Sequence, residues 1–246
     1  VVEYTGGSTG TSLALVCAVK RYPLHIVSSD AFTREKLDHM RLLGAELKII
    51  PSEAGRMTQE LFRAMIEAAR VITAETGGFW TNQLNNPDQL PGYHRLGEEI
   101  WAQTEGAIDG FVQSVGTSAS LRGTSEALRR HNARVRVVAV EPAESPVLSG
   151  GKPGAHKIDG IGVGFIPPLW RPEIVNAIER VSTEDATAMA FRLAAEEGIF
   201  VGTSTGANVV GALRLAAELG PDATVAAIAV DTGMKYLKTF GALTTD

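Results

Sequence analysis

Cysteine, histidine and aromatic residues are scarce in this chain of 246 residues. It has one cysteine, Cys17, five histidines, and aromatic residues make up 6% of the sequence. A single cysteine excludes an internal disulfide framework and a cysteine-based zinc site, and it favours a reducing, cytoplasmic setting. The histidines are scattered without ligand spacing, and no pair of carboxylates stands out. We therefore predict no metal site.

Long apolar runs and blocks of like charge are also absent. The longest uncharged stretch, residues 198–213, is interrupted by glycine, serine, threonine and asparagine, so no membrane-spanning helix is expected. Lysine and arginine number 23 against 28 acidic residues, and both signs are scattered along the chain. We therefore expect neither a nucleic acid nor a membrane as partner. A hydrophobic fraction of 44% predicts a globular fold with a sizeable core.

Short β-branched runs alternate with helical patterns along nearly the whole chain. This alternation is typical of parallel sheets covered by helices. The strands are predicted at residues 1–4, 25–28, 46–50, 110–115, 135–140, 178–181 and 225–230. The helices are predicted at residues 11–20, 34–43, 58–73, 92–103, 121–131, 183–196 and 207–218.

The clearest helix is the one at residues 183–196. Ser182 and Asp185 have the spacing of a capping box at its start, and Gly198 is placed to end it. Two proline-containing stretches interrupt the alternation. We interpret residues 85–92 as a crossover between subdomains and residues 145–172 as a long structured loop, which in a compact domain is usually functional.

Turns of glycine, serine and threonine follow predicted strands and precede predicted helices at residues 5–10, 116–120 and 202–206. Backbone N–H groups, hydroxyls and the helix dipole at such turns favour an anion. Because α/β proteins bind ligands at the carboxyl ends of their strands, the turns together predict a small anionic ligand. None has the spacing of a P-loop, a dinucleotide fingerprint or a serine-hydrolase elbow, so a nucleotide-binding protein is only an alternative.

A series of motifs in a fixed order resembles a known enzyme family. They lie at residues 2–10 (VEYTGGSTG), 83–87 (QLNNP), 115–117 (VGT), 138–142 (VAVEP), 145–147 (SPV), 156–162 (HKIDGIG), 164–167 (GFIP), 202–207 (GTSTGA) and 233–237 (GMKYL). In this order the chain resembles the cysteine synthase and cystathionine β-synthase family, which are pyridoxal-phosphate enzymes of fold type II. The likeness covers nearly the whole chain, and the HKIDGIG stretch is its most specific part.

The resemblance implies a two-domain α/β fold like that of the tryptophan synthase β-subunit, with mostly parallel sheets between helices in three α/β/α layers. A smaller domain at residues 1–84 would carry a loop for the substrate carboxylate. A larger domain at residues 85–246 would bind the cofactor, pyridoxal 5'-phosphate, in the cleft between the two. A homodimer in the cytoplasm is implied as well.

The resemblance also implies roles for individual residues. Gly116, Thr117, Ser118, Ala119 and Ser120 would hold the cofactor's phosphate. Ser204 would hydrogen-bond the pyridine nitrogen, and Ser8 would lie near the ring hydroxyl. The substrate carboxylate would be bound by Thr5, Gly6, Gly7 and Thr9 with help from Gln83.

The chain departs from the family pattern at each of these loops. Gly6 and Ser8 stand where the family loop, TSGNTG, has serine and asparagine, which puts the choice of substrate in question. Ser118 and Ala119 replace glycines of the phosphate loop, GTGGT, where side chains would either crowd the phosphate or turn outward. The Schiff-base lysine of the family lies upstream of the carboxylate loop. We therefore predict no catalytic residue in these 246 residues and expect the segment before them to be missing.

The activity implied is β-replacement, in which an activated serine loses its β-substituent and a thiol or sulfide adds. This is the reaction of a cysteine synthase of the O-acetylserine sulfhydrylase type, with a small amino acid and a sulfur nucleophile as its partners. Two alternatives stay open. One is a serine or threonine dehydratase-type lyase of the same fold, and the other is a catalytically inactive protein that binds the cofactor or another ligand.

Overall fold

The computed structural model describes residues 1–55, 58–237 and 240–241. The chain divides into two compact units, Val1–Asn86 and Pro87–Asp246. Each unit has its own parallel sheet, with three strands in the first and four in the second. The predicted fold class, mostly parallel sheets flanked by helices, is confirmed.

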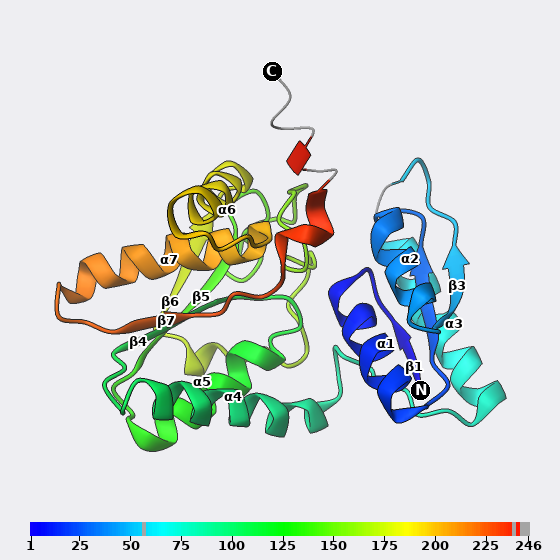
Figure 1. The fold of residues 1–246 in the computed structure, drawn as a ribbon, viewed down its shortest axis with the longest axis horizontal. Helices are drawn as coiled ribbons and strands as arrows, with labels where there is room; N and C mark the ends of the chain where they lie inside the picture. The colour runs from blue at the N-terminus through cyan, green and yellow to red at the C-terminus, as the bar shows by residue number, and fades with distance from the viewer. Residues whose placement is uncertain (56–57, 238–239, 242–246) are drawn as a thin grey trace. The chain divides into compact units, whose positions relative to one another are not determined.

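The first unit is built on strands in the order β1-β2-β3. Figure 1 shows α1 and α2 on one face of this sheet and α3 on the other. The core on the α1 and α2 side includes the buried Cys17, Ile26 and Met40. The elements are β1 (Val2–Tyr4), α1 (Ser8–Lys20), β2 (His25–Ser29), α2 (Arg34–Leu42), β3 (Glu46–Ile50) and α3 (Gln59–Thr76).

The second unit is built on strands in the order β6-β5-β4-β7. Helices α4 and α5 cover one face of this sheet, and α6 and α7 cover the other (Figure 1). The elements are α4 (Leu90–Gln103), β4 (Gly110–Ser114), α5 (Ala119–His131), β5 (Arg136–Pro142), β6 (Ala177–Val181), α6 (Thr183–Glu197), α7 (Thr203–Leu219) and β7 (Val225–Ala227). Short 3-10 turns lie at η1 (Pro87–Gln89), η2 (Pro172–Ile174) and η3 (Gly233–Tyr236).

Neighbouring residues of β4 and β5 contribute to different cores. Phe111 and Val137 belong to the cluster with Leu121 and Leu128 of α5. The next residues, Val112 and Val138, belong to the cluster with Ala207 and Leu215 of α7. Successive side chains of a strand point to opposite faces, so a strand covered on both sides needs apolar residues without interruption. This is why the short β-branched runs identify these strands in the sequence.

The capping residues predicted for the helix at residue 183 are confirmed in α6. The Ser182 hydroxyl accepts a hydrogen bond from the Asp185 N–H at 3.0 Å. The helix ends at Gly198 in the left-handed conformation, with φ of 69°. These contacts fix both ends of α6 locally.

Four helices begin earlier than the sequence predicts. One is α4, which starts at Leu90 instead of residue 92, and the other three start in turns of small polar residues. Helix α1 starts at Ser8 instead of residue 11, α5 at Ala119 instead of 121, and α7 at Thr203 instead of 207. Serine, threonine and glycine have low helix propensity, so a pattern of apolar residues misses them. Several predicted site residues therefore lie in the first turns of helices and not in the loops before them.

The stretch 85–92, interpreted as a crossover between subdomains, contains the boundary of the two compact units, between Asn86 and Pro87. It also contains η1 and the start of α4, whose first turn accommodates Pro91. One further prediction needs correction. Strand β7 ends at Ala227 and not at Val230, because side chains of α7 bind the backbone beyond it. The stretch 145–172 is a long loop as predicted, apart from the first residue of η2.

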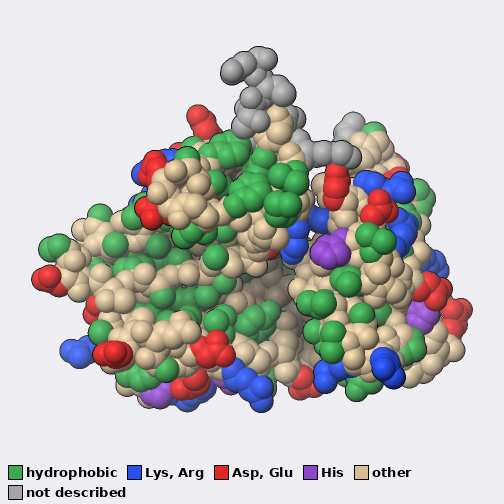
Figure 2. All heavy atoms as spheres, viewed as in Figure 1, with side chains coloured by type: hydrophobic (Ala, Val, Ile, Leu, Met, Phe, Trp, Pro, Cys, Tyr) green, Lys and Arg blue, Asp and Glu red, His purple; other side chains and the backbone are tan. Residues whose placement is uncertain are grey.

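The surface carries both signs of charge. Lysine and arginine side chains are interspersed with aspartate and glutamate on the face drawn in Figure 2. Within the described ranges, no helix has the length and apolar character needed to cross a membrane.

Candidate functional site

The turn at residues 5–10 connects the carboxyl end of β1 to α1. Thr5 is held by its own N–H, which donates to the Val27 carbonyl at 3.0 Å, and its hydroxyl accepts from the Gly7 N–H at 3.2 Å. Gly7 occupies the N-cap position, where no described side chain caps the helix, and the first turn has no acidic residue. The start of α1 therefore offers backbone donors and a positive dipole end to an anion.

Gly6 and Gly7 of this turn lie close to side chains from elsewhere in the first unit. A Cβ added to Gly6 would lie 2.0 Å from the Phe32 ring, and one added to Gly7 would lie 2.8 Å from Cδ of Lys36. The Phe32 ring thus fills the space that a side chain at position 6 would need. Lys36, which sequence reasoning missed, is buried and has its ammonium nitrogen 3.5 Å from that Gly7 Cβ position.

Thr9 and Gln83, predicted to bind the same carboxylate, lie together although 74 residues separate them. The Thr9 hydroxyl donates to Oε1 of Gln83 at 2.9 Å. The amide nitrogen of Gln83 donates to the Tyr4 carbonyl at 3.0 Å. These bonds fix the orientation of the Gln83 amide beside the start of α1.

The carboxylate of Glu3 binds the backbone N–H of Gln83. Glu3 is fully buried on β1, and its Oε2 accepts from the Gln83 N–H at 3.0 Å and from the Thr81 hydroxyl. Its Oε1 accepts from the Tyr4 N–H at 2.8 Å. Sequence reasoning missed this residue, and the available signal was an acidic side chain inside an apolar strand.

Burial raises the pKa of the Glu3 carboxyl above its ordinary value of 4.5, while the hydrogen bonds from Thr81 and Gln83 favour its ionised form. Desolvation is the larger of these effects. The ionised carboxylate is therefore tolerated in the core only because the segment that carries Gln83 supplies donors to it.

The turn at residues 116–120 connects β4 to α5 in the second unit. Ser118 is the N-cap residue and has the left-handed conformation, with φ of 73°. Its hydroxyl is buried and has no hydrogen-bond partner among the described residues. A Cβ on Gly116 would lie 2.5 Å from the Gly160 carbonyl oxygen, so this position has no room for a side chain. The turn therefore has two features: the start of α5 has no side-chain cap, and the backbone at Gly116 packs directly against the backbone at Gly160.

Ser120 in the same turn is held by Gln113 of β4. The amide nitrogen of Gln113 donates to the Ser120 hydroxyl at 2.7 Å, and the hydroxyl donates back to the amide oxygen at 3.1 Å. Gln113 is buried and was not among the predicted site residues. The hydroxyl of Ser120 is therefore used inside the protein.

The first turn of α7 is held by its hydroxyl groups. The Thr203 hydroxyl accepts from the Asp159 N–H at 3.4 Å, and the Thr205 hydroxyl accepts from the Val230 N–H at 3.0 Å. Between them lies Ser204, which is also buried. It stands in the first turn of α7, at the position predicted to contact the pyridine nitrogen.

Asn208, one turn further along α7, was also missed by sequence reasoning. Its amide oxygen accepts from the Ser114 N–H at 2.6 Å, and its amide nitrogen donates to the Ile228 carbonyl at 2.8 Å. One buried side chain thus links α7 to the end of β4 and to the segment after β7. The signal for it was an asparagine within a helix of small and apolar residues.

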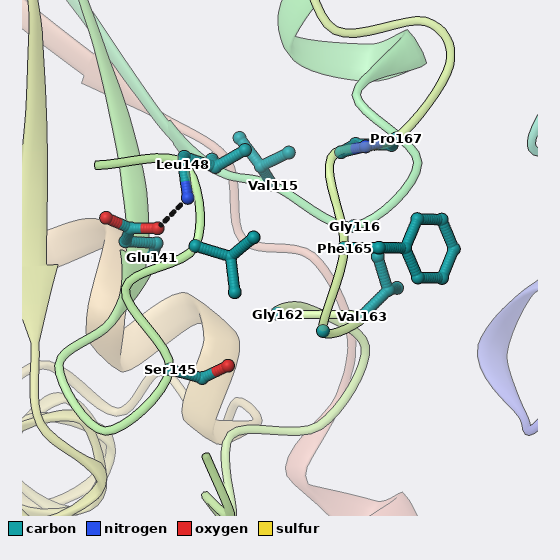
Figure 3. Close-up of a pocket in the computed structure, with 11 residues that line it drawn as sticks. Val115, Gly116, Glu141, Ser145, Leu148, Gly162, Val163, Phe165 and Pro167 are labelled. Carbon is teal, nitrogen blue, oxygen red and sulfur yellow. Dashed lines mark hydrogen bonds between the residues drawn. The ribbon is translucent and has the colours of Figure 1, made fainter. Parts of the chain in front are cut away.

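A cavity of about 10 Å³ lies beside the second unit's turn, between Gly116 and the loop at residues 162–167. Figure 3 shows the Glu141 carboxylate directed at the Leu148 N–H, 2.7 Å away, and the Phe165 ring directed away from both. The volume is enough for about one water molecule. Glu141 therefore shapes the loop at residues 145–149 and does not face a substrate-sized space.

A larger hollow of about 370 Å³ lies in the first unit and includes His25 and Glu46. These residues begin β2 and β3, so the hollow is at the amino ends of the strands. Ligands of α/β proteins bind at the carboxyl ends, where the turn at residues 5–10 lies. None of the predicted site residues lines this hollow.

The sequence pattern of the family described as pyridoxal-phosphate dependent enzyme matches residues 1–231. The chain belongs to this family. It is 38% identical to a cysteine synthase of Staphylococcus aureus over 242 residues, which are 97% of this chain and 76% of the relative.

Two solved structures are similar throughout this chain. One is a cysteine synthase from Entamoeba histolytica, with a TM-score of 0.89 and 34% identity, covering 99% of this chain and 71% of that one. The other is an O-acetylserine dependent cystathionine β-synthase from Helicobacter pylori, with a TM-score of 0.88 and 32% identity, covering 96% and 76%. The prediction of fold type II architecture is confirmed by these neighbours.

As a member of the family the protein is an enzyme of the transferase or lyase type that depends on pyridoxal 5'-phosphate. The second unit fits the phosphate of this cofactor. The start of α5 lacks a side-chain cap among the described residues, the buried Ser118 hydroxyl has no described partner, and a side chain at Gly116 would collide with backbone. The described residues contain no group of three or more histidine, cysteine or acidic side chains able to hold a metal ion.

Proposed function

We propose that this chain forms the substrate- and cofactor-binding part of a cysteine synthase of the O-acetylserine sulfhydrylase type. It would act on an activated serine and a sulfur nucleophile by β-replacement. The observation that carries the proposal is the hydrogen bond between Thr9 and Gln83 at the uncapped start of α1. It joins two motifs, far apart in sequence, that would bind one carboxylate. The similarity to cysteine synthases over nearly the whole chain supports the same activity.

In the proposed site the smaller domain, residues 1–84, binds the amino-acid substrate. Thr5, Gly6, Gly7 and Thr9 would hold the α-carboxylate through backbone N–H groups and hydroxyls, with the amide of Gln83 beside them. The buried Glu3 keeps Gln83 in position. Ser8, in the first turn of α1, would lie near the cofactor's ring hydroxyl.

The larger domain, residues 85–246, would bind the cofactor. The backbone of Gly116, Thr117, Ser118, Ala119 and Ser120 would surround the phosphate, and the Ser204 hydroxyl would hydrogen-bond the ring nitrogen. When bound, the cofactor supplies an electron-withdrawing ring, and a neutral serine at its nitrogen keeps that ring a mild electron sink, which favours elimination at the β-carbon. We assign no general base among these residues.

The finer parts of the proposal concern the partners. A relative described as O-acetylserine dependent supports O-acetylserine as the activated serine, with sulfide or a thiol as nucleophile. A homodimer is proposed from the family resemblance alone, and a cytoplasmic setting is proposed from the scarcity of cysteine.

A dehydratase-type lyase is the second candidate, and the Phe32 ring beside Gly6 favours it. This ring occupies space where the related loops carry a serine, so the side chain of the bound amino acid meets a different surface. Elimination without addition of sulfide would then be the reaction. An inactive protein that keeps the cofactor site is the third reading.

The experiment is a product assay with the full-length protein and pyridoxal phosphate, run once with O-acetylserine and once with serine as substrate. Cysteine formed only when sulfide is present supports the synthase. Pyruvate formed from serine without sulfide supports the dehydratase instead, and bound cofactor without either product supports the inactive protein.

A matched pair of variants tests the carboxylate site itself. Thr9→Val removes the bond to Gln83 and should raise the KM for O-acetylserine about tenfold. Ser12→Ala, which is exposed on the same helix, should leave the KM within about twofold of wild type. Equal KM values for both variants would contradict the assignment.

A further inference from the structure

Ser118 combines features that are each unfavourable for a serine. Its backbone is left-handed, which brings a Cβ close to the carbonyl oxygen and favours glycine. It occupies an N-cap position, where serine normally accepts a hydrogen bond from the helix, but it makes none with the described residues. Its hydroxyl is also buried without a described partner. A glycine at this position would avoid all of these costs.

Ser118 differs from the other strained residues of the chain. The non-glycine residues with positive φ are Arg21, Ala54, Asn82, Glu105 and Ser118. Among these described residues Ser118 is the buried one, with 3% of its surface exposed. At exposed turns the backbone is free to relax and water satisfies polar groups. At Ser118 neither is possible, so strain and an unsatisfied hydroxyl coincide at the start of a helix that can bind an anion.

The hydroxyl of Ser120, two residues further along the turn, is already bonded within the protein and is not free to donate to an anion. Ser120 donates its proton to the amide oxygen of Gln113 and accepts from the amide nitrogen. Its hydrogen atom is therefore directed into the protein. Of the two buried or partly buried serines in the turn, Ser118 is the one whose proton is not used by a described residue.

Two other buried hydroxyls on α5 also lack a described hydrogen-bond partner, but their surroundings differ from those of Ser118. Thr124 and Ser125 also have buried hydroxyls without described partners. Both lie inside the helix, beyond its first turn, with helical backbone. They therefore lack the strain and the proximity to unbonded N–H groups that distinguish Ser118, and they provide matched controls.

We propose that the Ser118 hydroxyl donates a hydrogen bond to the phosphate of the cofactor, taking the role that Ser120 cannot fill because Gln113 holds it. The strained conformation is then retained because it aims backbone N–H groups and one side chain at the same anion. This inference rests on the proposed phosphate site at residues 116–120. It accounts for a serine where the related loops have glycine.

The test compares pyridoxal phosphate with pyridoxal, which lacks the phosphate. Dissociation constants are measured by quenching of tryptophan fluorescence in the full-length protein freed of cofactor. Ser118→Gly should weaken binding of pyridoxal phosphate about tenfold and leave the binding of pyridoxal unchanged. The same variant should raise the Tm of the cofactor-free protein by about 2–4 °C, because glycine relieves the left-handed strain.

Two further variants separate the hydroxyl from the strain. Ser118→Ala removes the hydroxyl and keeps the strain, so it should weaken pyridoxal phosphate as much as Ser118→Gly without raising the Tm. Ser125→Ala removes an unsatisfied hydroxyl elsewhere on α5 and should leave both dissociation constants unchanged. A loss of affinity in Ser118→Ala but not in Ser118→Gly would overturn the inference, because the effect would then come from strain.

The affinities of the wild-type protein distinguish a failure of this inference from a failure of the proposed phosphate site. If wild type binds pyridoxal phosphate no better than pyridoxal, the phosphate site at residues 116–120 is wrong and the inference is overturned with it. If wild type prefers pyridoxal phosphate and Ser118→Gly keeps that preference, the site stands and only the role of Ser118 is overturned.

Discussion

The turns at residues 5–10 and 116–120 both lead from a parallel strand into a helix, yet they are built in different ways. In the first unit the crowded positions are glycines. The Thr5 hydroxyl accepts from the Gly7 N–H within the turn, and the Thr9 hydroxyl donates to Gln83. In the second unit a serine has the left-handed position and its hydroxyl has no described partner. The hydroxyls of Thr5 and Thr9 are thus hydrogen-bonded within the first unit, whereas the Ser118 hydroxyl of the second turn has no described partner. The first turn is preorganised by the protein, and the second contains a polar group that a ligand would satisfy.

The largest expected difference between the units concerns glycines that lack room for a side chain. In Gly206→Ala, on α7, the new Cβ would lie 2.0 Å from the Ala186 carbonyl oxygen of α6, and neither helix backbone can move easily. We expect the free energy of unfolding to fall by about 3 kcal/mol, measured by urea unfolding.

Gly6→Ala is the matched change in the first unit. Its Cβ would meet the ring of Phe32, which is only partly buried and can rotate toward solvent. A loss of about 1 kcal/mol is expected. If Gly6→Ala costs as much as Gly206→Ala, the Phe32 ring cannot rotate away and is held as firmly as the backbone of α6.

The second prediction concerns the buried Glu3, whose carboxylate accepts a hydrogen bond from the Gln83 N–H in the first unit. Burial raises its pKa above 4.5, so the folded protein binds this proton more tightly than the unfolded chain. The resulting stability is present below pH 4.5 and is lost as the pH rises through the folded-state pKa. In Glu3→Gln this dependence is absent. The free energy of unfolding of wild type minus that of the variant should therefore fall in urea titrations as the pH rises from about 4 through the folded-state pKa of Glu3.

Glu67→Gln on α3 provides a control of opposite sign. The hydrogen bond from Arg70 lowers the pKa of Glu67, so its contribution is lost when the pH falls and not when it rises. The difference between wild type and this variant should therefore increase with pH. A parallel response of the two variants would show that the burial of Glu3 does not control its titration.

The smallest expected effects concern the helix caps, which should be alike in the two units. The Ser182 hydroxyl accepts from the Asp185 N–H at 3.0 Å in α6, and the Thr58 hydroxyl accepts from the Leu61 N–H at 3.2 Å in α3. Ser182→Ala and Thr58→Ala should each lower the free energy of unfolding by about 1 kcal/mol in thermal and urea unfolding. A much larger loss at either position would mean that the cap also holds a tertiary contact.

The strands could be predicted from the sequence because both faces of each sheet are covered. The centre of β5 is an uninterrupted apolar run, Val137 to Val140, and β4 contains the adjacent Phe111 and Val112; such short apolar runs are typical of strands covered on both faces. The starts of α1, α5 and α7 could not be predicted, because contacts from distant residues decide them. Thr203 and Thr205 are helical where their hydroxyls bind the backbone at Asp159 and Val230, and helix propensity does not report such contacts.

The candidate site was predictable in its motifs but not in the residues that support it. The bond between Thr9 and Gln83 agrees with motifs that can be recognised separately. Glu3 and Gln113 carry no motif, and their importance depends on partners that only the folded chain brings near. Composition and periodicity indicate which face of a helix or strand is buried. They do not indicate which polar side chain on the buried face has a hydrogen-bond partner.

The link that Asn208 makes between β4 and the segment after β7 has a consequence for how the enzyme can evolve. Ser204 and Asn208 are four residues apart on α7 and lie on the same side of the helix. Inserting or deleting one residue between them would rotate Ser204 by about 100° relative to the anchored amide. The four-residue spacing therefore sets the direction of the Ser204 side chain. Substitutions between Ser204 and Asn208 should be tolerated far better than insertions or deletions there.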